Sequence, residues 1–362
     1  MPQTFPFTRA NPSDWSPGQR LTSAQANTLD KNAAQAADGR LWSEIAILKS
    51  FRKSTITNGG PAIFWDPPSG RWINGGANAG APTASYSFDG ADDWTALTVP
   101  AGTNWGSTIC GASNGFGTVI LCGGGGSATT SKIRQSSDSG NTWSTRNVNA
   151  GGSEFISCIV WHPAAALFII GLSNAASTNI EISGDGITWT QRTGLPNSLA
   201  RGSANGVGSS SGAASNGSVV VMLAASSSNK CLRSTDGATW TESTLPSTSS
   251  WTAVAWNATS GKFMAIASNA IATSADGITW SSSGLNAPFN TSATSLTSYG
   301  RAWLASGANT GQFGLAISKD DGVSWRNVKI CSAALYATAI GDNQACAVTS
   351  GGVVYASIRG GL

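Results

Sequence analysis

The segment Ser-Gly-Asp-Gly-Ile-Thr-Trp at residues 183–189 carries the pattern that decides the fold, because it recurs along the whole chain. Six copies occur in the 362 residues: SFDGADDW (87–94), SSDSGNTW (136–143), SGDGITW (183–189), STDGATW (234–240), SADGITW (274–280) and SKDDGVSW (318–325). Their closing tryptophans are 49, 46, 51, 40 and 45 residues apart. A regular period of this length indicates that each repeat is one supersecondary unit in a repetitive architecture.

The order of signals inside one repeat predicts four short strands. In the third repeat, the apolar run ISCIVW (156–161) is followed by a turn, a second run LFIIGL (167–172), a polar loop and IEIS (180–183). The Ser-Asp pattern comes next, and the polar segment TQRTGLP (190–196) follows it. Short strands separated by turns rich in Gly, Pro, Asn and Asp are typical of all-β repeat folds.

The chemistry of the repeated pattern is that of a tight turn. Asp and Ser side chains bond the backbone amides of their own turn, and Gly adopts a left-handed conformation without steric cost. The aromatic ring that follows can close an apolar gap between neighbouring sheets. We therefore expect structural roles for six aspartates and six tryptophans: Asp89, Asp138, Asp185, Asp236, Asp276 and Asp320, with Trp94, Trp143, Trp189, Trp240, Trp280 and Trp325.

The six copies resemble the Asp-box (BNR) repeat of sialidase-like β-propellers, and the resemblance covers about residues 50–362. It implies an all-β, seven-bladed propeller in which the boxes lie away from the ligand face, so that they carry no catalytic role. The first copy departs from the pattern, since Asp92 and Asp93 stand where Gly-x-Thr is expected.

A closing strand completes the expected ring. After the sixth box come the runs LYATAIGDN, QACAVTS and GVVYASIRG, which supply three strands and no box. Phe51 precedes Arg52 and Lys53 as Trp325 precedes Arg326 and Asn327. We therefore predict that residues 50–57 pair with residues 352–358, which would protect the last sheet edge.

Residues 1–49 read as a separate attachment segment, with a helix over about 22–38 and a seam of small residues at Ala26, Leu29, Ala33 and Ala36. The run WSPGQRLTSAQANTLDKNAAQAADG resembles the N-terminal particle-anchoring segments of bacteriophage tail proteins, which implies a tail adaptor or fibre protein as partner. A helix that only packs on the ring is the alternative. A homotrimer and a single copy on an adaptor both remain open.

Composition excludes several classes of protein. The net charge is +3 and only 11% of residues are charged, without basic clusters, which argues against nucleic acid as a partner. No apolar run is long enough to span a membrane, and MPQTFPF does not read as a secretory signal. The six cysteines lack metal-ligand spacing and are expected to be buried thiols, and His162 is expected to be structural. No cofactor or metal is expected.

A glycosidase is the enzymatic alternative, because sialidase-like propellers include such enzymes. Glycoside cleavage usually needs two carboxyl groups about 5–9.5 Å apart. Most acidic residues here lie in boxes, in turns or in residues 1–49, and among Glu154, Glu181 and Glu242 only Glu154 is expected on the ligand side. The family's Phe-Arg-Ile-Pro motif is missing, and none of the four tyrosines pairs obviously with a glutamate.

The sequence favours a non-catalytic adhesin on a phage virion tail, assembled in the host cytoplasm, that recognises bacterial surface polysaccharide through its loops. Polar loops at 75–84, 123–132, 172–179 and 307–314 suit sugar hydroxyls. Candidate ligand-binding residues are Trp105, Phe155, Trp251, Phe289, Phe313 and Glu154, although recurrence of the aromatics at matching positions also fits a core role. A virion scaffold without receptor contact is the third possibility.

Overall fold

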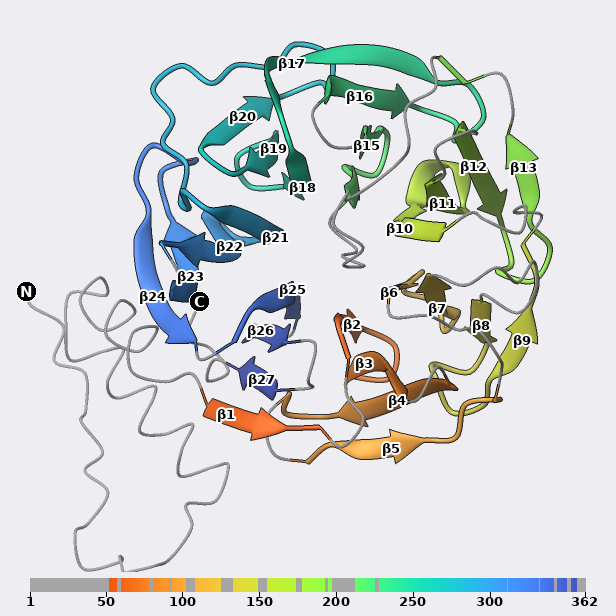
Figure 1. Cartoon of the computed structure of the whole chain (residues 1–362). Helices are drawn as coiled ribbons and strands as arrows, with labels where there is room; N and C mark the ends of the chain where they lie inside the picture. The colour runs from red at the N-terminus through yellow and green to blue at the C-terminus, as the bar shows by residue number, and fades with distance from the viewer. Residues whose placement is uncertain are drawn as a thin grey trace, which may run out of the picture.

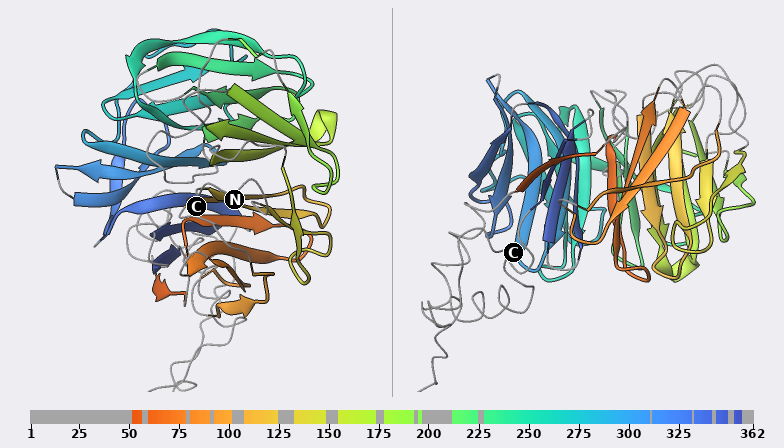
Figure 2. Two further views of the ribbon diagram at one scale, coloured as in Figure 1. Left: turned by 45° about the vertical axis from the view of Figure 1, so that its right-hand side comes forward. Right: turned by 90° about the horizontal axis from the view of Figure 1, so that it is seen from below.

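The chain folds into antiparallel sheets arranged radially around one axis, as the computed structural model shows in Figure 1. The structure describes residues 52–56, 60–78, 81–90, 93–101, 108–124, 133–148, 155–173, 178–192, 195–196, 212–224, 228–310, 312–331, 333–341, 344–349 and 353–356. The first strand of each sheet lies nearest the axis and the last lies at the rim. Figure 2 shows the strands running steeply through the thickness of the disc. This arrangement is a β-propeller.

Six of the seven sheets follow the chain order from the axis outward, whereas the closing sheet has β1, the first strand of the chain, at its rim. The first four are β2 (Ala62–Asp66), β3 (Arg71–Asn78), β4 (Ala81–Ser87) and β5 (Thr95–Leu97); β6 (Thr108–Ser113), β7 (Val119–Gly124), β8 (Ile133–Ser136) and β9 (Ser144–Arg146); β10 (Phe155–His162), β11 (Leu167–Ser173), β12 (Thr178–Ser183) and β13 (Thr190–Arg192); and β14 (Ala213–Ser215), β15 (Val220–Leu223), β16 (Ser228–Ser234) and β17 (Thr241–Ser249). The others are β18 (Trp251–Asn257), β19 (Lys262–Ala267) and β20 (Ala270–Ser274); β21 (Ser292–Tyr299), β22 (Ala302–Asn309), β23 (Gln312–Ser318) and β24 (Arg326–Cys331); and β25 (Leu335–Gly341), β26 (Gln344–Thr349), β27 (Val353–Ala356) and β1 (Arg52–Thr55).

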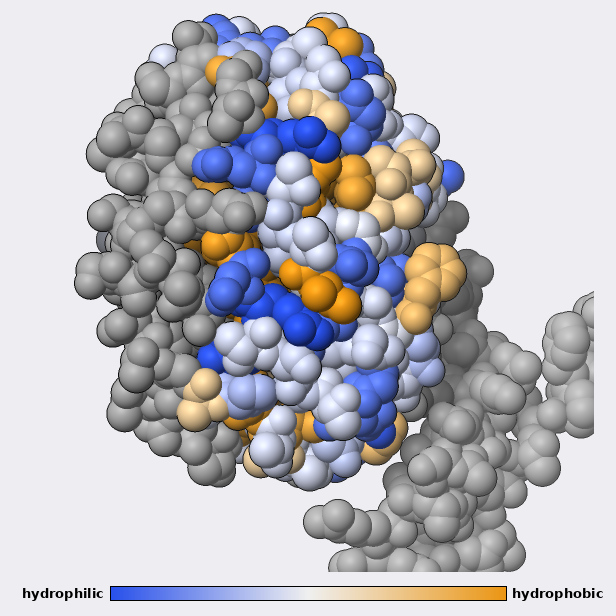
Figure 3. Space-filling model, turned by 90° about the vertical axis from the view of Figure 1, so that its right-hand side faces the viewer, coloured by the Kyte–Doolittle hydropathy of each residue, from blue (hydrophilic) through white to orange (hydrophobic). Residues whose placement is uncertain are grey.

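The second strands are apolar without alternation because neighbouring sheets cover both of their faces. In β11, Phe168, Ile169, Ile170 and Leu172 are all fully buried. Continuous apolar runs are characteristic of strands buried on both sides. The core is consequently divided into seven hydrophobic clusters, one between each pair of neighbouring sheets. The side of the rim that Figure 3 shows is mostly polar in its described part, with small, separate apolar patches.

The strand pairing expected at the ring closure is present. Arg52 pairs with Ala356 and Thr55 pairs with Val353, so β1 becomes the outer strand of the sheet that ends the chain. Segments nearly 300 residues apart in sequence therefore share one ladder, and Figure 1 shows β1 beside β27. Closure of this kind removes an edge that would otherwise be open to aggregation.

The expectation of a seven-bladed ring with an N-terminal helical anchor is wrong in two respects. Six of the sheets are complete four-stranded blades, whereas the sheet β18–β20 has only three strands. After Trp280 the chain reads SSSGLNAPFN, and Gly284 and Pro288 interrupt any strand; only Ser281 still bonds to Thr273, through N···O distances of 2.9 and 3.0 Å. The described residues also form no α-helix, and the helix expected over about 22–38 lies outside them.

The expectations for the cysteines and for His162 are confirmed. All six cysteines are buried and no disulfide joins them. His162 is fully buried at the end of β10, where its Nε2–H donates to the carbonyl of Thr235 (3.1 Å) and its Nδ1 lies 3.0 Å from Ser215 Oγ. The ring therefore links its own blade to the next one. Within the described ranges, no helix has the length and hydropathy to cross a membrane.

Candidate functional site

The two faces of the disc differ in the turns that they carry. The turns that join the first to the second strand of a sheet, and the third to the fourth, lie on one face, because both follow strands of the same direction. We call this the turn face. The hairpins between second and third strands, and the connections from one sheet to the next, lie on the opposite face, which we call the loop face.

The repeated Ser-Asp turns use their own polar groups. In the turn at 234–240, Asp236 Oδ1 accepts the backbone N–H groups of Ala238 (2.8 Å) and Thr239 (2.7 Å), while Ser234 Oγ accepts the N–H of Gly237 (2.8 Å). The indole Nε1–H of Trp240 donates to the carbonyl of Gly237 (3.1 Å). The turns at 183–189 and 274–280 have the same bonds. These carboxylates are therefore committed to turn structure.

In the first copy, at 87–94, a different carboxylate accepts the hydrogen bonds of the turn. Asp93 accepts the N–H of Phe88 (3.1 Å) and bonds Ser87 Oγ, and Asp89 Oδ1 also accepts from Ser87 Oγ (3.2 Å). The departure noted in the sequence thus moves the acceptor from the third to the seventh position of the copy. The sequence shows Asp92 and Asp93 in place of Gly-x-Thr, but it does not show which carboxylate accepts the bonds.

The turn tryptophans lie between blades. Each packs in a different hydrophobic cluster, against the sheet that precedes its own; Trp143, Trp189, Trp240 and Trp280 are buried, and Trp94 and Trp325 are half-buried. The turn glycine makes the approach close. A Cβ at Gly186, where φ is +74°, would lie 2.5 Å from Ile120 Cδ1 of the preceding sheet. The turns are therefore wedges that hold the ring together.

The carboxylate of Asp236 makes the stability of its turn depend on pH. The backbone N–H of Thr239 is the main cause that lowers the pKa of Asp236 to about 2, and that of Ala238 and the Ser234 hydroxyl add to it. Because the pKa in the unfolded chain is about 3.9, the stabilisation is complete above that pH and is lost as the pH falls through about 2. Between about pH 4 and about pH 2, we expect the thermal midpoint to fall more steeply in the wild type than in Asp236→Asn. Parallel midpoint curves for the two proteins would contradict this account.

Where the structure describes them, the residues that the sequence nominated for ligand binding differ in burial. Trp105 and Glu154 lie outside the described residues, and Phe155 is the first residue of β10. Trp251 and Phe289 are each 2% exposed, and Trp251 Nε1 donates to Ser247 O (3.0 Å). Both rings pack in the core in this structure, which leaves no ring face for a sugar. Phe313 is half-buried at the start of β23 on the loop face.

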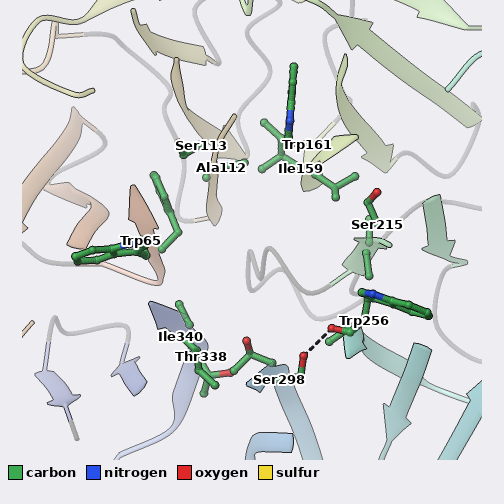
Figure 4. Close-up of a pocket in the computed structure, with 18 of the residues that line it drawn as sticks. Trp65, Ala112, Ser113, Ile159, Trp161, Ser215, Trp256, Ser298, Thr338 and Ile340 are labelled. Carbon is green, nitrogen blue, oxygen red and sulfur yellow. Dashed lines mark hydrogen bonds between the residues drawn. The ribbon is translucent and has the colours of Figure 1, made fainter. Parts of the chain in front are cut away.

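A central cavity of about 470 Å³ lies on the axis, between the first strands of the seven sheets (Figure 4). Trp65, Trp161 and Trp256 alternate around it with Ser113, Ser215 and Ser298. Figure 4 shows the three indole rings directed away from the axis, into the spaces between blades. The serine hydroxyls are also engaged: Ser298 Oγ donates to Trp256 O (2.6 Å), Ser215 contacts His162, and Ser113 bonds Asp66. The cavity wall is thus structural and offers few free groups.

The loop face between β18–β20 and β21–β24 presents an ordered polar surface that we call the amide platform. Its members come from three segments that meet there: the β19–β20 turn, the segment before β21 and the β22–β23 turn. They are Asn269, Asn290, Thr291, Asn309, Thr310 and Gln312. All are exposed except Asn309, which is half-buried.

Hydrogen bonds fix the geometry of the platform. Asn290 N–H donates to Asn309 Oδ1 (2.7 Å), and Asn290 Oδ1 accepts from Thr310 N–H (3.2 Å) and Thr291 Oγ1 (3.0 Å). Thr310 N–H also reaches Thr291 Oγ1 (2.9 Å), and Asn309 Nδ2 donates to Pro288 O (3.2 Å). The arrangement is held in place before any ligand arrives.

The backbone at Thr310 is strained. Its φ is +42°, a left-handed conformation that β-branched residues rarely adopt. Such strain persists only where the surrounding structure imposes it, and it is concentrated at functional sites. Here the bonds to Asn290 and Thr291 impose it.

The platform has the chemistry of a binding surface for neutral polar groups. The side-chain amides of Asn269 and Gln312 are exposed, and no bond to another described residue occupies them. Asn and Gln provide both donors and acceptors. The six platform residues include no carboxylate, histidine or cysteine that could transfer a proton. The sequence indicated the 307–314 loop as a sugar-binding loop, but it did not indicate Asn269, Asn290 or Thr291. The one feature that could have pointed to them is an amide or hydroxyl side chain in a loop between strands.

Known structures share the fold at low sequence identity. The chain resembles an inactive virginiamycin B lyase from Staphylococcus aureus with quinupristin at a TM-score of 0.64 and 13% identity, covering 84% of this chain and 98% of that one. A xyloglucanase from Xanthomonas campestris gives a TM-score of 0.59 and 15% identity over 85% of this chain and 54% of its own length. Sqt1 from Saccharomyces cerevisiae gives 0.52 and 15%, with 86% of each chain covered. No family model and no curated protein matches the sequence. What these likenesses establish is the fold: the chain is a β-propeller.

Proposed function

We propose that this chain is a non-catalytic carbohydrate-binding protein, an adhesin of a phage tail that recognises bacterial surface polysaccharide through its loop face. The observation that carries the proposal is the amide platform: exposed amide and hydroxyl groups pre-ordered by mutual hydrogen bonds. Groups fixed before binding lose little conformational entropy when a ligand arrives. Sugar hydroxyls match such donors and acceptors without any need for charge.

The positions of the acidic residues support binding without cleavage. Glu181 is fully buried in β12, and Glu242 forms an ion pair with Lys230 (2.8 Å) on the rim. The aspartates of the turns are bonded to their own backbone on the opposite face. A glycosidase needs two carboxyl groups across one sugar linkage. The described loop face offers no such pair beside the platform.

The course of β1 supports attachment from the other side. β1 follows a third strand in its sheet, so Arg52 lies at the turn face and Thr55 lies nearer the loop face. Residues 1–49 therefore join the ring on the turn face. We propose that this segment binds a tail adaptor or fibre protein, which leaves the loop face pointing outward, and that the turns belong to the Asp-box type that they resemble.

The test uses the full chain and three single variants. We expect Asn290→Ala and Gln312→Ala to weaken binding to purified bacterial polysaccharides by about fivefold or more each, since a lost hydrogen bond is worth about 1 kcal/mol. Asn327→Ala is the matched control, because Asn327 is an exposed amide on the rim strand β24. A bacterial polysaccharide array selects the ligand, and titration calorimetry measures each variant.

Three outcomes decide the proposal. Selective loss in the platform variants, with no new reducing ends in the polysaccharide, supports an adhesin. Release of reducing ends would show a glycosidase instead. Binding that is equal in all variants, or no binding by the wild type to the array or to whole bacteria, would reject the proposal and favour a scaffold.

A further inference from the structure

One of the seven interfaces between sheets lacks the wedge that the other six contain. The turn tryptophans occupy six clusters, one each. The cluster between β21–β24 and the closing sheet has no tryptophan among its described members, which include Leu304, Leu315, Ile317 and Leu335. This interface belongs to the one sheet whose third and fourth strands, β27 and β1, are not joined by a Ser-Asp turn.

The register of the closing sheet shows what stands at the missing position. In the sheet β21–β24, Ile317 pairs with Arg326; the next residue of the third strand is the turn serine Ser318, and the residue before Arg326 is Trp325. The sheet β6–β9 has the same register: Gln135 pairs with Ser144, and Trp143 is the residue before Ser144. In the closing sheet Ala356 pairs with Arg52. In the sequence, Phe51 precedes Arg52 as Trp325 precedes Arg326, and Ser357 follows Ala356 as Ser318 follows Ile317.

The seat for such a ring can be identified by the same register. The turn glycine Gly322 approaches Met264 and Ile271 of the preceding sheet. Met264 follows the residue that pairs with the turn serine Ser274, and Ile271 lies three residues before that serine. In the next sheet, where Trp303 pairs with the turn serine Ser318, the residues at these two positions are Leu304 and Leu315. Both belong to the cluster without a tryptophan. An apolar side chain from outside the described residues would complete it.

We propose that the turn face between β22 and the closing sheet is the docking surface for residues 41–51 of this same chain, with Phe51 as the seventh wedge. The segment reads LWSEIAILKSF and so supplies five further large apolar side chains next to Phe51. At about 3.3–3.6 Å per residue, it can reach across the neighbouring turns. On the same face of the neighbouring sheet, Tyr299 at the end of β21 is 38% exposed. Attachment and ring closure would then share one segment.

The experiment compares Phe51→Ala, Phe51→Trp and Leu48→Asp in the full chain, with Phe116→Ala as control, since Phe116 is 84% exposed on the turn face. We expect Phe51→Ala to lower the thermal midpoint by about 5 °C or more and Phe51→Trp to preserve it. Leu48→Asp should speed hydrogen exchange in the β21–β22 turn without affecting the β6–β7 turn. Light scattering reports whether a second copy is bound.

The results separate the alternatives. If Phe51→Ala fails to fold while Phe51→Trp folds, the wedge is supported. A midpoint unchanged by Phe51→Ala, together with unchanged exchange in β22 and β25, would overturn the proposal. A dimer that dissociates in Leu48→Asp would assign the docked segment to a second copy and would also overturn it. None of these readouts depends on the carbohydrate ligand.

Discussion

Replacement of Trp240 by alanine is expected to lower the free energy of unfolding by about 3–5 kcal/mol, the range found for large aromatic residues in cores. Trp240 is 6% exposed and belongs to the cluster between two blades that also contains Ile169, Val220 and Leu232. Its removal leaves a cavity between sheets and deletes the bond to Gly237. Both losses affect the contact that holds neighbouring blades together.

Two further variants identify the cause of the Trp240 effect. Trp240→Phe keeps most of the apolar volume but not the indole N–H, so its loss should be about half as large or less. Phe116→Ala removes an aromatic ring that is 84% exposed, and its effect should stay within about 0.5 kcal/mol. Urea unfolding followed by circular dichroism measures all three. Equal effects of Trp240→Ala and Phe116→Ala would show that the turn tryptophans are not wedges.

Replacement of Gly307 by alanine is expected to cost about 3 kcal/mol and to weaken ligand binding at the platform. A Cβ at Gly307 would lie 2.2 Å from Ser292 O and 2.4 Å from Phe289 Cδ2. The first of these is backbone and cannot yield as a flexible side chain would. The segment that holds Asn290 and Thr291 would therefore have to shift, and the platform with it.

Gly300 provides the matched control for Gly307. It lies in the turn between the same two strands, its φ is +53°, and a Cβ there would meet no atom within 4 Å. Gly300→Ala is therefore expected to lower the free energy of unfolding by only about 1 kcal/mol, the cost of a left-handed backbone at a residue with a Cβ. Unfolding and calorimetric titration compare the two. If Gly307→Ala were no more costly than Gly300→Ala and bound ligand normally, the close approach beneath the platform would be unimportant.

Local chemistry made much of the fold predictable. Ser, Asp, Gly and Trp at constant spacing specify a turn whose hydrogen bonds lie within seven residues, so six copies in one sequence identify six similar turns. The closing strand was also predictable, because Phe51-Arg52-Lys53 parallels Trp325-Arg326-Asn327 at the end of the sixth turn. In both cases the information is local and repeated.

The expectation of a fourth strand after Trp280 was wrong, and the roles of two aromatic residues stayed open, where local patterns are ambiguous. The turn at 274–280 is intact, yet the segment after Trp280 is too polar and too rich in breakers to form a fourth strand. Trp251 and Phe289 stand at entries to first strands, where an aromatic ring can face either the ligand or the core, and both are buried. Burial depends on the neighbouring sheet, which a sequence pattern does not specify.

The amide platform could not be predicted from sequence because its parts become neighbours only in the folded ring. Asn269, Asn290 and Thr310 lie in three separate segments of two sheets. Their juxtaposition depends on the missing fourth strand, since the chain from Ser281 to Thr291 runs beside β20 instead and bonds Ser268 and Asn269. The irregular sheet therefore places the residues from which we infer a function.

The most direct test of the central claim, that the loop face at the platform binds carbohydrate, is hydrogen exchange of the full chain with and without the polysaccharide selected on the array. The account predicts slower exchange in segments 268–270, 288–292 and 308–313, and unchanged exchange in the six Ser-Asp turns. Slower exchange confined to those turns or to the strands around the central cavity would contradict it.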